Sequence, residues 1–360
     1  MKKAALATLV LSLLSAAAAF AADPSVRLLT DASGIDDRAF NAAAWRGILK
    51  FYGDTLSRQP RRGSAYDVVT AKTPDMYIPN IKQVSDEKYD LVVATGFAFA
   101  DAFAEVAPQY PGQRYLIIDV DSVNLPNVMQ ATFAEQEGSY LVGAAAALKA
   151  RADGVKDPRF GFIGGIPGSA MTRFEVGYAQ GIVSVLPGAA VVDYYANDWA
   201  KPELAKARAR TWYDSGVYCV FSAAGMTGTG AIAMAREYRA AGRNVWAVGA
   251  DSDQYDEGIY DSAKGRSAVL TSMIKRVDTA TVYALKALKA GTFRGGAVVF
   301  DAKSDGVAFS DRNVELGKDI VAKVNAIKRD IVAGKVKVYS KYADARAARA
   351  VPSGLQAKDD

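Results

Sequence analysis

The chain has 360 residues, of which half are apolar and 23% are charged, a balance that suits a globular protein with a sizeable core. Its formal net charge is +5, to which Lys2 and Lys3 contribute, and no basic run is interleaved with aromatic residues, so we expect no nucleic-acid partner. The absence of histidine excludes His-based acid–base catalysis, Ser-His-Asp catalysis and His-ligated zinc.

The N-terminus has the pattern of a secretory signal peptide. A short positive stretch, Met1 to Lys3, precedes an apolar run over 4–20, and Ala19-Phe20-Ala21 gives the small-x-small pattern of a cleavage site. The run is shorter than the roughly 20 residues that span a membrane, and no later stretch is long and apolar enough. We predict a signal peptide over 1–21, cleaved near Ala21, and a periplasmic mature protein. No cysteine stands at the end of this segment, so we expect no lipid anchor.

After this segment, short β-branched or aromatic runs alternate with amphipathic stretches of helical length. A first set of strands is expected at 26–32, 66–72, 90–96 and 114–121. A helix over 136–151 should begin a second unit, whose strands are expected at 159–166, 190–196, 217–224 and 244–251. A late strand at 268–274, a helix over 277–290, a hairpin over 298–310 and a helix over 314–333 complete the pattern. Such alternation is typical of parallel sheets flanked by helices.

These elements predict an α/β fold of two doubly wound parallel-sheet lobes. The first lobe is expected over 22–130 plus about 260–292, and the second over 131–259 plus about 293–335. The remaining tail, 336–360, is expected to be partly frayed. The single cysteine, Cys219, lies in an apolar strand and is expected to be a buried core thiol rather than a nucleophile.

In doubly wound sheets, ligands gather at the carboxyl ends of the strands. Carboxylates, amides and aromatic rings are concentrated at these ends, which favours a flat ligand with hydroxyl groups in a cleft between the lobes. The candidates are Asp31, Asp36, Asp37, Phe40, Asn41, Gly96, Phe97, Asp119, Asp121, Trp199, Gly225, Asp251, Asp253, Gln254 and Lys275.

Several of these candidates have a structural interpretation that is at least as good. Asp36 or Asp37 can cap the helix that follows, and Phe40 can belong to the core. A lysine such as Lys275 is more often solvated than in contact with ligand. The pattern does not distinguish Asp119 from Asp121.

Two segments resemble parts of enzymes. The segment Gly225 to Gly230 lies between a strand and a helix, with Asp251 about 20 residues later, as in a dinucleotide site, but its glycine order is G-x-x-G-x-G. The segment Asp31 to Asp37 resembles the aspartate cluster of calcium-dependent nucleoside hydrolases, but Ala32 and Ser33 stand where a second carboxylate is needed. We expect no enzymatic activity, no metal site and no cofactor.

Six segments, at 28–47, 92–102, 159–166, 223–230, 248–254 and 270–280, run in an order that resembles the basic membrane protein (Bmp) family of ABC-transporter substrate-binding proteins. The resemblance is to the purine-nucleoside receptor type. It implies a type I periplasmic-binding fold whose two lobes are joined by three crossing segments and close on a ligand. It also implies capture of a purine nucleoside and its delivery to an inner-membrane ABC permease. We expect the protein to be a monomer.

Carried over position by position, the family's pocket falls on Asp31, Asn41, Asp119, Trp199, Gly225, Asp251 and Lys275, and Phe97 lies in a matching segment. The family more usually has phenylalanine where Trp199 stands. Our hypothesis is that the base stacks on Trp199, that Asp251 and Lys275 hold the ribose, and that the other polar residues read the base. A receptor for another flat heteroaromatic such as a flavin, or for a sugar, remains an alternative.

Overall fold

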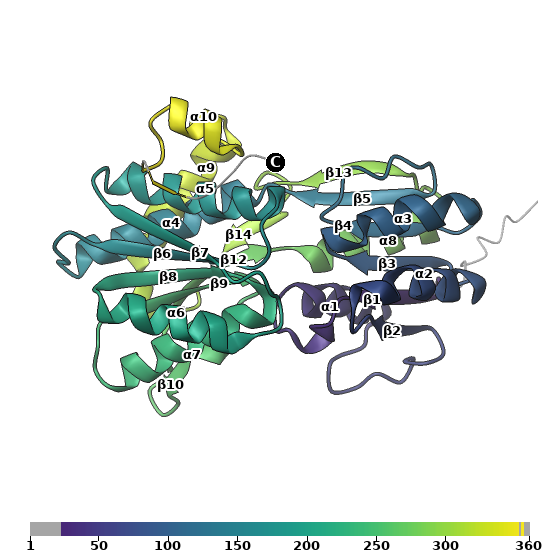
Figure 1. Cartoon of the computed structure of the whole chain (residues 1–360), viewed down its shortest axis with the longest axis horizontal. Helices are drawn as coiled ribbons and strands as arrows, with labels where there is room; N and C mark the ends of the chain where they lie inside the picture. Colours follow the sequence, from purple (N-terminus) through teal and green to yellow (C-terminus); the bar gives the residue numbers. More distant parts are fainter. Residues whose placement is uncertain (1–22, 353, 356–360) are drawn as a thin grey trace, which may run out of the picture.

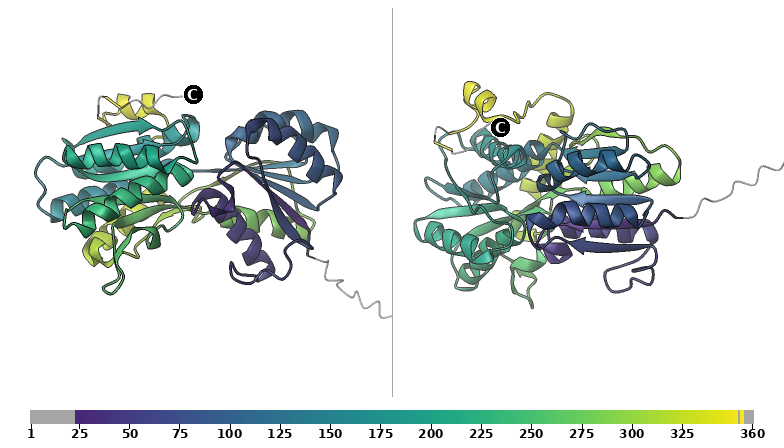
Figure 2. Two further views of the ribbon diagram at one scale, coloured as in Figure 1. Left: turned by 60° about the horizontal axis from the view of Figure 1, so that its bottom comes forward. Right: turned by 45° about the vertical axis from the view of Figure 1, so that its right-hand side comes forward.

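The computed structural model describes residues 23–352 and 354–355. The predicted signal peptide, its cleavage site and the predicted absence of a lipid anchor concern residues outside this part of the chain. The described residues form two lobes joined by a narrow waist, as Figures 1 and 2 show. No helix among the described residues is long and apolar enough to cross a membrane.

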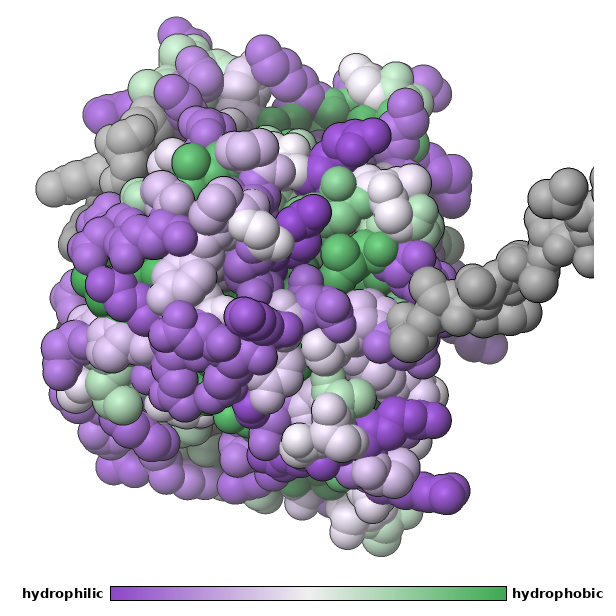
Figure 3. Space-filling view, turned by 90° about the vertical axis from the view of Figure 1, so that its right-hand side faces the viewer, coloured by the Kyte–Doolittle hydropathy of each residue, from purple (hydrophilic) through white to green (hydrophobic). Residues whose placement is uncertain are grey.

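The first lobe is built on a six-stranded parallel sheet in the order β13-β5-β4-β3-β1-β2. Its strands are β1 (Val26–Thr30), β2 (Tyr66–Thr70), β3 (Leu91–Thr95), β4 (Tyr115–Ile118), β5 (Val128–Phe133) and β13 (Gly296–Phe300). Helices α1 (Phe40–Tyr52) and α8 (Val277–Lys289) pack on one face, and α2 (Tyr77–Asp86) and α3 (Ala100–Val106) on the other. The central strands are buried on both faces, which explains their continuous apolar sequence. Seen from its far end, this lobe has a mostly hydrophilic surface (Figure 3).

The second lobe repeats this plan in the order β14-β12-β9-β8-β6-β7, with only β14 antiparallel. Its strands are β6 (Arg159–Gly164), β7 (Ala190–Tyr195), β8 (Val217–Ala223), β9 (Trp246–Asp251), β12 (Val269–Lys275) and β14 (Val307–Phe309), and a short hairpin joins β10 (Ile259–Asp261) to β11 (Arg266–Ser267). Helices α4 (Glu135–Ala152), α5 (Ser169–Val185) and α9 (Lys318–Val332) cover one face, and α6 (Pro202–Asp214) and α7 (Gly225–Ala240) the other. The predicted fold class is confirmed, and Cys219 is buried as predicted.

The chain crosses between the lobes three times: at Ala134, between β5 and α4; at Arg276, between β12 and α8; and over 301–306, between β13 and β14. The predicted lobe boundaries are wrong in their late parts, because β12 belongs to the second lobe and β13 to the first. The cause is strand pairing: β12 continues the second sheet beside β9, and β13 pairs with β5. The predicted hairpin over 298–310 is also wrong, since its two strands lie in different sheets.

The C-terminal tail is ordered up to Leu355 in the described residues, so the prediction that it frays is wrong for that part. Helix α10 (Tyr342–Ala347) packs against α5, and Val351 and Leu355 are buried. Gln180 and the backbone of Tyr339 exchange two hydrogen bonds of 2.8 and 2.9 Å. The tail thus supports α5 from outside.

Helices α4 and α5 cross at very short range because glycines stand at the contact. A Cβ atom on Gly177 would lie 2.6 Å from Cα of Gln136, and one on Gly181 would lie 2.8 Å from the backbone N of Ala144. Any larger residue would force the helices apart. This contact matters for function because α4 starts at a crossing segment and α5 lines the interlobe cavity.

We expect Gly181→Ala to lower the free energy of unfolding by roughly 1–3 kcal/mol, because the added methyl group overpacks the α4–α5 contact. Chemical denaturation measures the change. The matched control is Gly188→Ala, since a Cβ atom at Gly188 meets nothing within 4 Å. Equal stabilities of the two variants would contradict the close packing described here.

Candidate ligand-binding site

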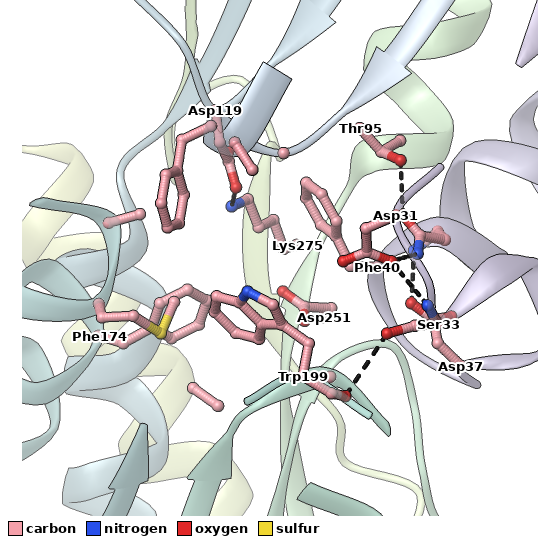
Figure 4. A pocket seen from close by; sticks show the side chains of 18 residues that line it. Asp31, Ser33, Asp37, Phe40, Thr95, Asp119, Phe174, Trp199, Asp251 and Lys275 are labelled. Carbon is pink, nitrogen blue, oxygen red and sulfur yellow. Dashed lines mark hydrogen bonds and ion pairs between the residues drawn. The ribbon is translucent and has the colours of Figure 1, made fainter. Parts of the chain in front are cut away.

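A cavity lies between the two lobes, where the carboxyl ends of both sheets face each other (Figure 4). The space among its side chains is about 660 Å³, including the part that opens to solvent, within the range of small-molecule sites. All eight residues predicted from the sequence to contact ligand lie in its lining. The lining comprises Asp31, Ser33, Asp37, Phe40, Asn41, Thr95, Gly96, Phe97, Ala98, Asp119, Ala170, Met171, Phe174, Trp199, Ala223, Gly225, Asp251 and Lys275.

Asp119 and Asp251 occupy equivalent places in the two lobes. Asp119 follows β4, the fourth strand of the first lobe, and Asp251 ends β9, the fourth strand of the second. Both have a φ of +65°, a left-handed conformation that is uncommon for residues other than glycine. Such strain persists where the surrounding structure enforces it, often at binding sites. Asp121, the other candidate beside Asp119, is exposed and does not line the cavity.

The first lobe contributes a chain of hydrogen bonds that orients Asp31 and Asn41. Thr95 Oγ1 donates to Asn41 Oδ1 at 2.5 Å, and Asn41 Nδ2 donates to Asp31 Oδ1 at 2.9 Å. The amide orientation follows from these partners. The arrangement leaves an N–H donor of Asn41 beside the second carboxylate oxygen of Asp31. The cavity therefore presents a hydrogen-bond donor next to an acceptor.

Asp37 has a structural role even though it reaches the cavity wall. Its carboxylate accepts hydrogen bonds from the backbone N–H groups of Ala39, Asn41 and Ala42 at 2.7–3.0 Å, which satisfies free donors at the start of α1. Burial, partly offset by these bonds, raises the pKa of Asp37 to about 6. The capping interpretation of this aspartate is confirmed.

A buried ionic network crosses the cleft at Lys275. Its ammonium lies 2.6 Å from Asp119 Oδ2 in the first lobe and 2.8 Å from Glu135 Oε1 at the start of α4, and its side chain is 1% exposed. Arg173 donates to the other oxygen of Glu135 at 2.5 Å. Burial alone would lower the pKa of Lys275, but Asp119, Glu135 and Asp251 raise it above its ordinary value. The alternative that this lysine is solvated is therefore wrong.

Asp251 stands beside this network without a partner of its own. Its carboxylate is buried, yet it makes no hydrogen bond or ion pair with any other described residue. Burial raises its pKa to about 7, with Lys275 opposing the shift and Asp119 adding to it. A buried carboxylate without donors is unfavourable, so this group is prepared to accept hydrogen bonds from a ligand.

The aromatic wall of the cavity comes from both lobes. Trp199, in the loop between β7 and α6, meets the ring of Phe97 from the first lobe edge-on, with ring centroids 6.3 Å apart. Phe40 and Phe174 lie near the ammonium of Lys275, with ring centroids 5.0 and 5.5 Å away. These rings provide flat apolar surfaces on which a planar ligand can stack.

Thr227 fixes the loop that carries Trp199. The backbone N–H of Thr227 donates to the carbonyl of Trp199 at 2.9 Å, and its hydroxyl donates to the carbonyl of Asp198 at 2.9 Å. Thr227 belongs to the glycine-rich segment from Gly225 to Gly230. Instead of lying between a strand and a helix, the segment forms the first turns of α7, and Gly230, where an added Cβ atom would lie 2.9 Å from the backbone N of Lys206, allows this helix to approach α6 closely.

The lobes contact each other in a closed arrangement. Ser33 Oγ donates to the carbonyl of Trp199 at 3.5 Å, and Ser252 Oγ donates to the carbonyl of Ala39 at 3.0 Å. Farther out, Arg38 and Glu257 form an ion pair of 3.3 Å. Each of these contacts joins a residue of the first lobe to one of the second, so opening the cleft would break them.

Sequence reasoning missed the second carboxylate of the network. Glu135 and its partner Arg173 are absent from the predicted site because they lie at or near helix starts, not at strand ends. Phe174 and Thr95 were missed as well, since an apolar helix position and a threonine that ends a buried, otherwise apolar strand give no distinct functional signal. An acidic residue directly after a crossing segment is the one feature that could have indicated Glu135.

Among the described residues, no group of three or more His, Cys, Asp or Glu side chains is arranged to hold a metal ion.

Comparisons with known proteins agree with this architecture. The family model Bmp, described as ABC transporter substrate-binding protein PnrA-like, matches residues 25–342. The CD4+ T-cell-stimulating antigen of Listeria monocytogenes is 36% identical over 324 residues, which are 89% of each chain. The ABC transporter nucleoside-binding protein BmpA of Lactococcus lactis is 33% identical over 326 residues, covering 89% of this chain and 90% of BmpA.

Among solved structures, an ABC transporter solute-binding protein from Aeropyrum pernix K1 superposes with a TM-score of 0.77 at 25% identity, covering 91% of this chain and 99% of that one. An arabinose-binding protein from Geobacillus stearothermophilus, AraP, has a TM-score of 0.57 at 13% identity over 81% of this chain and 98% of its own, a likeness of fold alone. The family match and the relatives extend over most of the chain. The chain therefore belongs to the Bmp family of PnrA-like ABC transporter substrate-binding proteins.

Proposed function

We propose that this protein is the periplasmic binding component of an ABC importer and that it captures a purine nucleoside in the interlobe cavity. The observation that carries the proposal is the pairing of an aromatic wall with the buried carboxylate of Asp251, which has no hydrogen-bond donor among the described residues. A purine supplies a flat ring, and a ribose supplies adjacent hydroxyl donors. The name of the Lactococcus lactis relative, a nucleoside-binding protein, supports the same substrate class.

We assign Asp31 and Asn41 to the base, and Asp251 and Lys275 to the ribose. Asp31 and Asn41 present an acceptor beside a donor, which matches the hydrogen-bonding edge of a purine whether it carries a 6-oxo or a 6-amino group. Asp251 is placed to accept from ribose hydroxyls, next to Lys275. Since Lys275 already contacts two carboxylates, it has one ammonium N–H left for a ligand oxygen.

The charge of the cavity favours nucleosides over nucleotides. Four carboxylates, from Asp31, Asp37, Asp119 and Asp251, line it together with a single ammonium that is already paired. A phosphate group brought into this enclosure would meet like charges at low dielectric. We therefore propose a neutral ligand rich in hydrogen-bond donors.

Calorimetric titration of the purified protein with guanosine, inosine and adenosine tests the proposal. We expect at least one of them to bind, while ribose alone, riboflavin and the corresponding 5′-monophosphate bind far more weakly or not at all. Binding of riboflavin or ribose without any nucleoside would favour the alternative ligands. Release of free base from a nucleoside during incubation with calcium, detected by chromatography, would instead indicate a hydrolase.

Asp251→Asn is expected to weaken nucleoside binding roughly 10- to 150-fold, because it removes a charged acceptor of hydrogen bonds. The matched control is Asp253→Asn, two residues away and outside the cavity lining. Calorimetry on both variants measures the difference. If Asp251→Asn binds like the control, the carboxylate does not contact the ligand.

Asp251→Asn is also expected to change the pH dependence of stability without ligand. The pKa of Asp251 is about 7 in the folded protein and near 3.8 ordinarily, so its protonated form favours folding and this contribution is lost as pH rises from about 4 to about 7. The free energy of unfolding of the variant, minus that of the wild type, should therefore rise with pH in this window, by at most about 1.4 kcal/mol per pH unit. Denaturation at several pH values measures it, and a constant difference would contradict the raised pKa.

A further inference from the structure

Gly165 lies directly after β6 and does not line the cavity, yet Trp199 rests on it. A Cβ atom on Gly165 would lie 2.6 Å from Cη2 of Trp199 and closer still to Cε3 and Cζ3. The six-membered ring of the indole thus packs flat against the Gly165 backbone. We propose that Gly165 is a positioning residue that sets the depth of the Trp199 ring in the cavity, and this proposal rests on the ligand site proposed above.

Neither backbone can move to make room for a larger residue at 165. The N–H of Gly165 donates to the carbonyl of Ala223 at 3.1 Å, and its carbonyl accepts from the N–H of Asn197 at 3.0 Å. Gly165 is thereby held between the two neighbouring strand ends. The Trp199 backbone is held in turn by Thr227. A side chain at 165 must therefore displace the indole itself.

The indole has one direction in which to move. Gly165 is behind it, and a Cβ atom on Gly225 would already be 3.7 Å from Cε3. Phe97 of the first lobe stands at the ring edge, at a centroid distance of 6.3 Å. The remaining space is the cavity, where a flat ligand would stack. Displacement of the ring therefore narrows the ligand site and disturbs the contact between the lobes.

The backbone conformation of Gly165 does not itself require glycine. Its φ lies outside the left-handed region between +20° and +160° that Gly96 and Gly225 occupy, so Gly165 does not need to be glycine on that ground. The three atoms nearest to an added Cβ atom all belong to the Trp199 indole. A substitution at position 165 therefore tests the placement of the Trp199 ring without the strain of a left-handed backbone.

The test compares Gly165→Ala, Trp199→Phe, the double variant and the control Gly188→Ala. The first readout needs no ligand: acrylamide quenching of tryptophan fluorescence. We expect Gly165→Ala to change the quenching of Trp199 while Trp45, Trp212 and Trp246, all buried, stay protected. In the Trp199→Phe background, adding Gly165→Ala should leave the quenching unchanged.

The second readout is the affinity for guanosine by calorimetry. Gly165→Ala should weaken binding roughly tenfold or more, whereas in the Trp199→Phe background it should cost much less, since a phenyl ring lacks the outer atoms of the indole. Equal losses in both backgrounds, or wild-type quenching and affinity in Gly165→Ala, would overturn the proposal. If the wild type binds none of guanosine, inosine and adenosine, the proposed ligand is wrong, and the quenching readout still decides the role of Gly165.

Discussion

The structure depends on a buried ammonium that has partners in both lobes. Lys275 is removed from water, and a charge in that position is tolerated only with compensating charges and hydrogen bonds. Glu135 belongs to the same lobe and remains beside Lys275 whatever the cleft does, whereas Asp119 reaches it from the other lobe. Opening the cleft therefore separates Lys275 from Asp119 without leaving the ammonium unpaired. The network therefore permits the cleft to open, and the contact between Lys275 and Asp119 favours one relative position of the lobes when it closes.

Closure of the cleft also has an energetic cost, the burial of the Asp251 carboxylate without a hydrogen-bond donor, which a ligand can offset. In the closed arrangement burial raises the pKa of Asp251, with Asp119 adding to the shift, and Asp251 has no donor of its own among the described residues. A ligand that supplies hydroxyl donors to Asp251 stabilises the closed form more than the open one, which is the condition for a ligand to shift such an equilibrium. The contact of Trp199 with Phe97 adds an aromatic component to the same equilibrium. Under the proposed function, charge and shape thus favour the same class of small, neutral, hydroxyl-bearing aromatic ligand.

The sequence was most informative where one physical rule decides the outcome. Alternating strands and helices predicted the paired α/β lobes, and the strand-end rule brought Asp31, Trp199 and Asp251 into one cavity. It was least informative where the place of a strand or the role of a side chain depends on a partner that is distant in sequence. Nothing local in β12 and β13 tells which sheet each joins, so their lobes were exchanged. The burial of Lys275 depends on Glu135, which is distant in sequence, and the role of Gly165 depends on an indole 34 positions later.

The most direct measurement of the central claim is mass spectrometry of the small molecule that leaves the purified protein when it is denatured. A cavity this enclosed, with interlobe contacts around it, is expected to retain its ligand through purification. The account predicts a purine nucleoside at close to one molecule per chain. A flavin, a free sugar or a phosphorylated nucleotide in that position would contradict it.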